Sequence, residues 1–239
     1  MKLINIFTVF FSIFTWTLPA STQTPLLDAT AKAVECRVIS GAKIRFIEAL
    51  NLVCLIGEID RDMAQNFLDL NLPKSFSIVV NSGGGYAESA LDIAEKILFK
   101  NGHVIVDNVC WSACANYLFL SGKTKVVLPR STVAWHGGPL HVAKPNIAPN
   151  RRKIFVELAD RSDLFFINIG VIKDLIYFPP FDAKGEIPKV KDLWIATQEQ
   201  LEEYYFVRGI EYMWDITKDP EFIAERAAGK TIHLKFKIP

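Results

Sequence analysis

Short apolar runs separated by amphipathic segments make up the chain from Leu52 onward. Runs rich in branched apolar residues predict β-strands, and they lie at 52–57, 76–80, 103–108, 124–129 and 131–135. Apolar residues recur at helical spacing in 62–70 and 86–99, which predicts two helices with one apolar face each. This order of strands and helices predicts an α/β fold, with a mostly parallel sheet covered by helices in repeated strand-helix units.

The pattern is weaker in the second half of the chain. Residues 150–170 form a long helix candidate, and a loop rich in Pro and Gly follows at 177–188. After the brief strand-like run DLWIA, Thr197 and Gln200 have the spacing of a capping box, which predicts a last core helix.

Four segments follow from these patterns. We expect a signal peptide at 1–20, an N-terminal extension at 21–51, one principal domain at 52–212 and a C-terminal appendage at 213–239. The appendage pattern predicts a helix at 221–227 and an edge strand at 232–238.

The first twenty residues have the layout of a secretory signal. Lys2 precedes an apolar-rich run from Leu3 to Leu18, and Pro19 and Ala20 follow it. The run is shorter than the roughly 20 residues that cross a bilayer, and it is interrupted by polar side chains. We therefore expect a soluble exported protein, periplasmic or secreted.

Composition and charge argue against wholesale disorder and against a nucleic-acid partner. Of the 239 residues, 50% are hydrophobic, which excludes wholesale disorder. The net charge is +1 and no block of five like charges occurs, so we expect no nucleic-acid partner.

The four cysteines allow three pairings. In an oxidising compartment the most economical pairing joins Cys36 to Cys54 and Cys110 to Cys114. A metal site is the weaker alternative, because Cys-x-x-x-Cys is not the usual zinc spacing and only four histidines are present. We expect neither a metal nor another cofactor.

The stretch NVCWSACANYLFLSG places Ser112 where a predicted strand meets a predicted buried helix. A turn there would expose the hydroxyl as a nucleophile, with the N–H of Ala113 pointing the same way. Serine is also a preferred N-cap residue, so Ser112 could instead only cap the helix.

Two further features could complete a catalytic site. His136 ends the run STVAW and precedes two glycines, although a histidine in an apolar strand is more often a core residue. The turn NSGGG could direct backbone N–H groups toward an anion, or could simply be a tight turn. His103, His141 and His233 are weaker candidates.

These blocks, in this order, resemble the proteolytic subunit of the Clp protease and its crotonase-like superfamily. The resemblance rests on LIGEID, IVVNSGGGYAESALDIAEKI, the serine turn, KVVLPRSTVAWHGG and DLWIATQEQLEEY, and covers roughly 52–207. It implies a ClpP/crotonase-like fold and a homo-oligomer.

The resemblance also implies roles for individual residues. Ser112 would be the nucleophile, His136 the general base and Asp192 the carboxylate that orients it, with oxyanion N–H groups from Gly85 and Ala113. Other aspartates could take the place of Asp192, namely Asp160, Asp163 or Asp182.

The chain departs from the family pattern at the site. Gly83 stands where the family usually has proline, and Ser112 is followed by Ala-Cys instead of Met-Gly. The bracket of Cys110 and Cys114 is foreign to the cytosolic enzymes. It could distort the serine turn, hold it in place, or make it sensitive to redox state.

The resulting hypothesis is an exported serine hydrolase, most simply a peptidase that acts on peptide or protein substrates. An esterase or thioesterase on the same fold is the first alternative, because a triad does not choose amide over ester. A non-catalytic binding protein is the second. Export implies no ATP-dependent unfoldase partner.

Overall fold

The structure is a computed structural model that describes residues 20–38, 43–139, 149–178, 193–221 and 224. Its centre is a seven-stranded sheet in the order β1-β2-β3-β4-β5-β7, with β6 paired to β4 beside this path. The strands are β1 (Ile44–Ile47), β2 (Leu52–Ile56), β3 (Ser77–Ser82), β4 (His103–Trp111), β5 (Thr124–Val127), β6 (Thr132–Ala134) and β7 (Ile210–Met213).

The sheet is mostly parallel, as the sequence pattern predicts. All pairs from β2 through β5 to β7 are parallel, and so is the pair of β4 with β6. Only β1 runs antiparallel to its neighbour β2. The α/β class is therefore confirmed.

Alternate residues of the strands are buried on opposite faces of the sheet. Val53 and Leu55 belong to the main core, whereas Leu52 and Cys54 belong to a second cluster on the other face. Burial on both faces explains why the strands are continuous apolar runs in the sequence.

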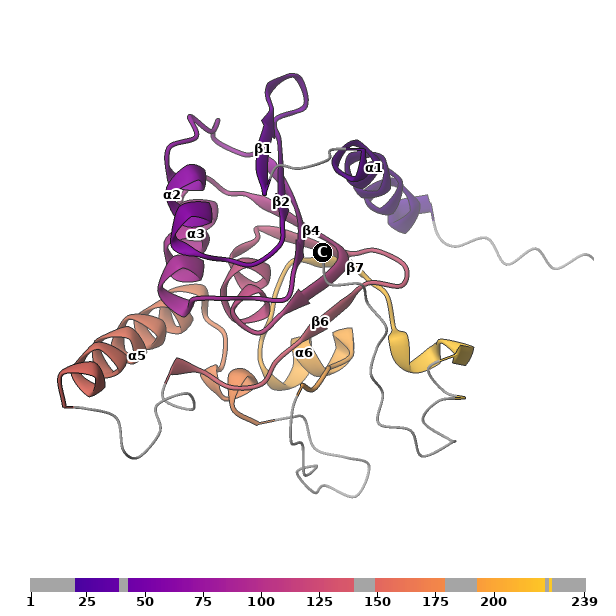
Figure 1. Ribbon diagram of the computed structural model, residues 1–239. Helices are drawn as coiled ribbons and strands as arrows, with labels where there is room; N and C mark the ends of the chain where they lie inside the picture. The colour runs from indigo at the N-terminus through magenta and orange to yellow at the C-terminus, as the bar shows by residue number, and fades with distance from the viewer. Residues whose placement is uncertain (1–19, 39–42, 140–148, 179–192, 222–223, 225–239) are drawn as a thin grey trace, which may run out of the picture.

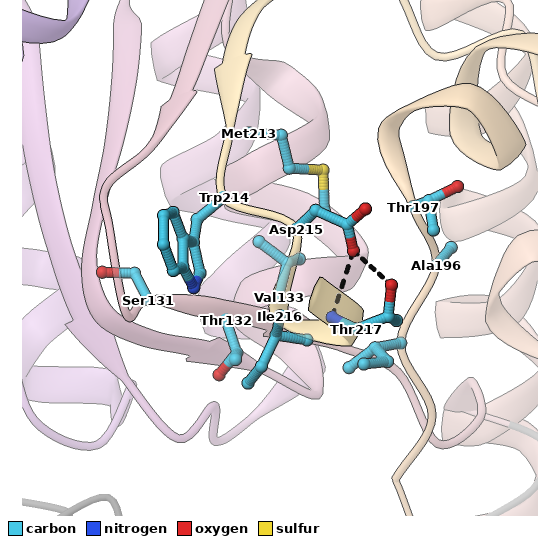
Figure 2. A pocket seen from close by; sticks show the side chains of 11 residues that line it. Ser131, Thr132, Val133, Ala196, Thr197, Met213, Trp214, Asp215, Ile216 and Thr217 are labelled. Carbon is cyan, nitrogen blue, oxygen red and sulfur yellow. Dashed lines mark hydrogen bonds between the residues drawn. The ribbon is translucent and has the colours of Figure 1, made fainter. Parts of the chain in front are cut away.

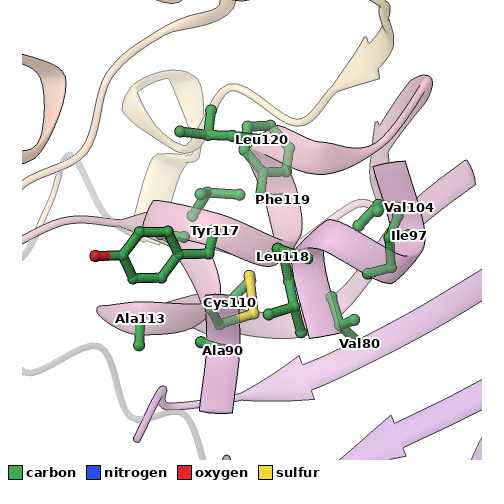
Figure 3. Packing of buried hydrophobic residues seen from close by; sticks show 14 of the residues in the cluster. Val80, Ala90, Ile97, Val104, Cys110, Ala113, Tyr117, Leu118, Phe119 and Leu120 are labelled. Carbon is green, nitrogen blue, oxygen red and sulfur yellow. A yellow bond between two sulfur atoms is a disulfide. The ribbon is translucent and has the colours of Figure 1, made fainter. Parts of the chain in front are cut away.

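The main core lies beneath three helical segments. These are α2 (Arg61–Leu68), α3 (Ala87–Phe99) and the π-helical turn η2 (Cys114–Phe119). Figure 3 shows part of this core, where Ala90 and Ile97 of α3 lie among side chains of β3, β4 and η2. The two predicted helices and the buried helix after Ser112 are thus present.

The opposite face of the sheet is covered by α1 (Ala20–Arg37), which Figure 1 shows on the far side of the sheet from α2 and α3. Ala29 and Ala33 of α1 are buried in the second cluster. A disulfide joins Cys36 to Cys54 of β2, which confirms that predicted pairing. The segment 21–51, expected only as an extension, contributes both α1 and β1 to the fold.

An ion pair also links α1 to the sheet. The Arg37 guanidinium donates two hydrogen bonds to the Asp107 carboxylate, at 2.8 and 2.5 Å. This pairing raises the pKa of Arg37. Asp107 is largely buried within β4, so the pair compensates a carboxylate that would otherwise be desolvated alone.

The second half of the chain adds helices that contribute residues, among them Phe165, Leu175 and Leu201, to the same main core. The helices of this part of the chain are α5 (Pro149–Ile169), η3 (Lys173–Ile176), α6 (Gln198–Tyr204) and η4 (Ile216–Lys218). The capping box predicted for Thr197 and Gln200 is present at the start of α6. Strand β7 was not anticipated from the sequence, because its short run IEYM shows no clear alternation.

Several expectations lie outside the described residues. These are residues 1–19 of the signal peptide predicted at 1–20, most of the loop at 177–188, and nearly all of the tail elements predicted at 221–227 and 232–238. In the ranges that the structure describes, no helix is long and apolar enough to cross a membrane.

Candidate active site

Three turns meet at the carboxyl ends of neighbouring parallel strands. The glycine turn 83–85 follows β3, Ser112 follows β4, and His136 follows β6 after one residue. Parallel strands end at the same edge of a sheet, which is where α/β folds place their sites. Residues that are distant in the sequence are brought together there.

Ser112 and His136 are in direct contact. The Oγ of Ser112 lies 2.5 Å from the Nε2 of His136, a hydrogen-bond distance. The serine is partly buried and the imidazole is exposed, so the pair is open to a ligand from solvent. A hydroxyl bonded to an imidazole in this way is the arrangement of a nucleophile and its general base.

The helix-cap interpretation of Ser112 does not fit its contacts. The N-cap residue of η2 is Ala113, and no side chain caps that end. The hydroxyl of Ser112 instead meets His136. Ser112 therefore does not use its side chain to stabilise the helix start.

The backbone of Ser112 is in an unusual conformation. Its φ is 56°, in the left-handed region that non-glycine residues rarely adopt. The N–H of Ser112 donates to Ala134 O at 2.9 Å, and its carbonyl accepts from the N–H of Asn116 at 2.8 Å. A strained serine between a strand and a helix is typical of nucleophile turns.

The glycine turn packs directly against this serine. Gly84 has a φ of +100°, and a Cβ built there would lie 2.7 Å from Ser112 Cβ. The N–H of Gly84 is already bonded to Ser82 Oγ at 3.1 Å. Gly84 therefore shapes the turn but has no N–H to offer a ligand.

Gly85, the residue expected to contribute to an oxyanion site, is held by Ile59. Ile59 donates to Gly84 O and accepts from the N–H of Tyr86, both at 2.8 Å. In the described part of the chain, no hydrogen bond uses the N–H of Gly85 or that of Ala113. Both groups remain available to an anion.

His136 is positioned by the strand that precedes it and by a buried amide. The bond from Ser112 N–H to Ala134 O holds the end of β6 against the serine turn. Asn116 Nδ2 donates to Gly137 O at 2.9 Å, while Asn116 Oδ1 is buried without a partner among the described residues. Asn116 is not among the predicted site residues, and its only signal in the sequence is that it is a polar residue inside an apolar helix.

Asp192, the predicted third member of the triad, and its alternative Asp182 lie outside the described residues. The other two alternatives, Asp163 and Asp160, have different surroundings. Asp163 accepts a hydrogen bond from Lys173 Nζ at 2.7 Å, and Asp160 is exposed on α5. No carboxylate of the described ranges contacts the His136 ring.

His103 has a structural role instead. Its two ring nitrogens lie 3.0 Å from Ser75 Oγ and 2.9 Å from Thr124 Oγ1. Burial lowers the pKa of His103. The remaining histidines, His141 and His233, are outside the described residues.

A disulfide brackets the candidate nucleophile. Cys110 and Cys114 are bonded to each other, which confirms this predicted pairing, and both are fully buried. Two disulfides are typical of proteins from an oxidising compartment.

A small cavity lies away from these residues. Figure 2 shows it between Ser131 to Val133, the segment from Met213 to Thr217, and Ala196 and Thr197. Its volume is about 10 Å³, enough for one water molecule. Its lining includes neither Ser112 nor His136, so it is not the site described above.

The described residues contain no cluster of three or more His, Cys, Asp or Glu side chains that could hold a metal ion.

Comparison with models of known protein families finds no match, and comparison with curated protein sequences finds none either.

Proposed function

We propose that this protein is a serine hydrolase with Ser112 as nucleophile and His136 as general base. The observation that carries the proposal is the 2.5 Å contact between Ser112 Oγ and His136 Nε2. The left-handed backbone of Ser112 and the two unused N–H groups beside it support the same conclusion.

The chemistry would proceed by acyl transfer. His136 Nε2 takes the proton of the Ser112 hydroxyl while Oγ attacks the substrate carbonyl carbon. The resulting oxyanion is bound by the N–H groups of Gly85 and Ala113. The imidazolium then protonates the leaving group, and water, activated by the same histidine, hydrolyses the acyl-serine.

Asp192 is the carboxylate that we propose to orient His136. Trp135 and Trp194 exchange two backbone hydrogen bonds at 2.9 Å as an antiparallel pair. This bridge brings the chain just after Asp192 beside the chain that leads into His136. His136 is one residue after Trp135, and Asp192 is two residues before Trp194.

The proposal extends to the kind of protein and substrate. We infer a peptidase with a ClpP/crotonase-like fold, which works outside the cytosol as a homo-oligomer on peptide or protein substrates. The parallel sheet with the site at its carboxyl edge and the two disulfides support this. A panel of peptide and ester substrates separates a peptidase from an esterase or thioesterase.

The first test is labelling with a fluorophosphonate probe, which reacts with activated serines. We expect wild type to label, and Ser112→Ala and His136→Ala to abolish labelling. His103→Gln is the matched control, because that histidine bonds hydroxyls far from Ser112 along the strand, and it should label normally. An unlabelled wild type would favour a non-catalytic binding protein.

The second test addresses the carboxylate. Asp192→Asn should lower kcat by orders of magnitude, whereas Asp163→Asn should leave it unchanged, because Asp163 already pairs with Lys173. Equal activity of the two variants would remove Asp192 from the proposed triad.

A further inference from the structure

The disulfide between Cys110 and Cys114 closes a small ring around Ser112. Cys110 is the penultimate residue of β4 and Cys114 is the first residue of η2, with their Cα atoms 5.2 Å apart. The ring therefore spans the strand end, the serine and the helix start. Ser112 lies inside this ring, so the disulfide restrains the backbone on both sides of the serine.

Both cysteines are anchored in the core. Cys110 pairs with Ser82 of β3 and with Val133 of β6, the strands that lead to the glycine turn and to His136. Cys114 is packed in the main core, and Figure 3 shows Cys110 and Ala113 of the same turn within that packing. The disulfide thus connects the helix start to the strand that is in register with both other parts of the site.

Ser112 needs such a restraint. Its left-handed φ of 56° is unfavourable for a residue with a Cβ, and no side chain caps the helix that follows. Two backbone hydrogen bonds hold the residue, to Ala134 and from Asn116. Without the ring, the turn could relax toward a negative φ, which would carry Oγ away from His136.

We propose that the Cys110–Cys114 disulfide is a positioning element that holds Ser112 in its reactive geometry, and that it is not a redox switch. The inference rests on the proposed hydrolase function. Both cysteines have 0% exposure. A dithiol reductant has to bring a thiolate to one of the sulfurs, and burial denies that approach while the protein is folded.

The matched comparison is between the two disulfides. Cys110→Ala/Cys114→Ala should lower kcat and the rate of probe labelling by about 100-fold with KM little changed, as expected for a misplaced nucleophile. Cys36→Ala/Cys54→Ala removes a disulfide distant from the site, and should reduce stability while leaving kcat within about twofold of wild type. Retention of kcat by the first variant, or an equal loss in both, overturns the inference.

A second measurement uses wild type and does not depend on the variants folding. Incubation with dithiothreitol under native conditions should leave kcat unchanged, and alkylation should find no free thiol at residues 110 and 114. Reduction of this disulfide in the folded protein would refute the burial argument. Reduction without loss of kcat would refute the positioning role as well.

A crystal structure of Cys110→Ala/Cys114→Ala separates this inference from the proposed function. We expect a changed φ at Ser112 and a longer distance from Oγ to His136 Nε2. An unchanged turn would refute the positioning role even if the protein proved to be no hydrolase. If wild type has no activity but the turn moves in the variant, only the hydrolase proposal fails.

Discussion

Two glycines with nearly the same φ allow the effect of close packing at the serine turn to be measured. Gly84 has a φ of +100° and Gly57 a φ of +103°. A Cβ at Gly57 would meet nothing within 4 Å. At Gly84 it would lie 2.7 Å from both Ser112 Cβ and Trp111 O, and 3.1 Å from Ala113 N. The two alanine substitutions share the backbone strain and differ in the clash.

The magnitudes follow from these contacts. A side chain at positive φ costs about 1–2 kcal/mol, partly offset by about 0.4–1 kcal/mol because alanine restricts the unfolded chain. Gly57→Ala should therefore lower the free energy of unfolding by about 1 kcal/mol. Gly84→Ala adds about 1–3 kcal/mol of overpacking, because two of the three crowded atoms are backbone atoms that cannot rotate away. Its total should be about 2–4 kcal/mol.

Activity should separate the two variants further. Displacing the serine turn by a few tenths of an ångström or more should reduce probe labelling of Gly84→Ala by about 100-fold, while Gly57→Ala labels like wild type. Urea unfolding measures stability, and the labelling rate measures the site. If Gly84→Ala and Gly57→Ala lost equal stability, or if Gly84→Ala labelled normally, the turn would have adjusted to the added Cβ. Its close packing would then not position Ser112.

Three further predictions concern stability. Arg37→Ala should lower the free energy of unfolding, measured in urea, by about 2 kcal/mol, because it leaves the buried Asp107 carboxylate unpaired. Asp107→Asn should lower it by only about 1 kcal/mol, because Arg37 can turn to solvent. A larger loss for Asp107→Asn than for Arg37→Ala would contradict this reasoning. Thr197→Ala removes the capping box of α6 and should cost about 1 kcal/mol, and an unchanged midpoint would contradict that role. Burial lowers the pKa of Lys125 to about 8 from 10.5, so between these pH values the unfolded chain binds more protons and stability should rise with pH. Relative to Lys125→Met, wild type should gain up to about 3 kcal/mol over that interval, and parallel curves would show that folding does not lower the pKa of Lys125.

The local patterns of the sequence determined the elements and the turns. Apolar runs predicted most strands, because strands buried on both faces need apolar residues at nearly every position. Helical spacing fixed α3, and the capping box fixed the start of α6. The cysteine pairing followed from short separations in the chain. Each of these depends on residues that are close in sequence.

The position of α1 could not be predicted in this way. Half of its apolar residues are alanines, and it is held by contacts with distant strands, by the disulfide to Cys54 and by the ion pair to Asp107. Strand β7 is likewise defined by its pairing with β5 and not by its own pattern. Both assignments depend on surfaces that the local sequence does not describe.

Local sequence and tertiary structure also determined different features of the candidate site. The sequence by itself determined that a serine, a histidine and a glycine turn each follow an apolar strand. Only the tertiary structure decided that β6 pairs with β4 so that His136 reaches Ser112, that Ser112 adopts a positive φ, and that Asn116 joins the two turns. The physical reason is that strand register and a strained turn are set by packing between segments far apart in the chain, whereas the type of each element is set by its own residues.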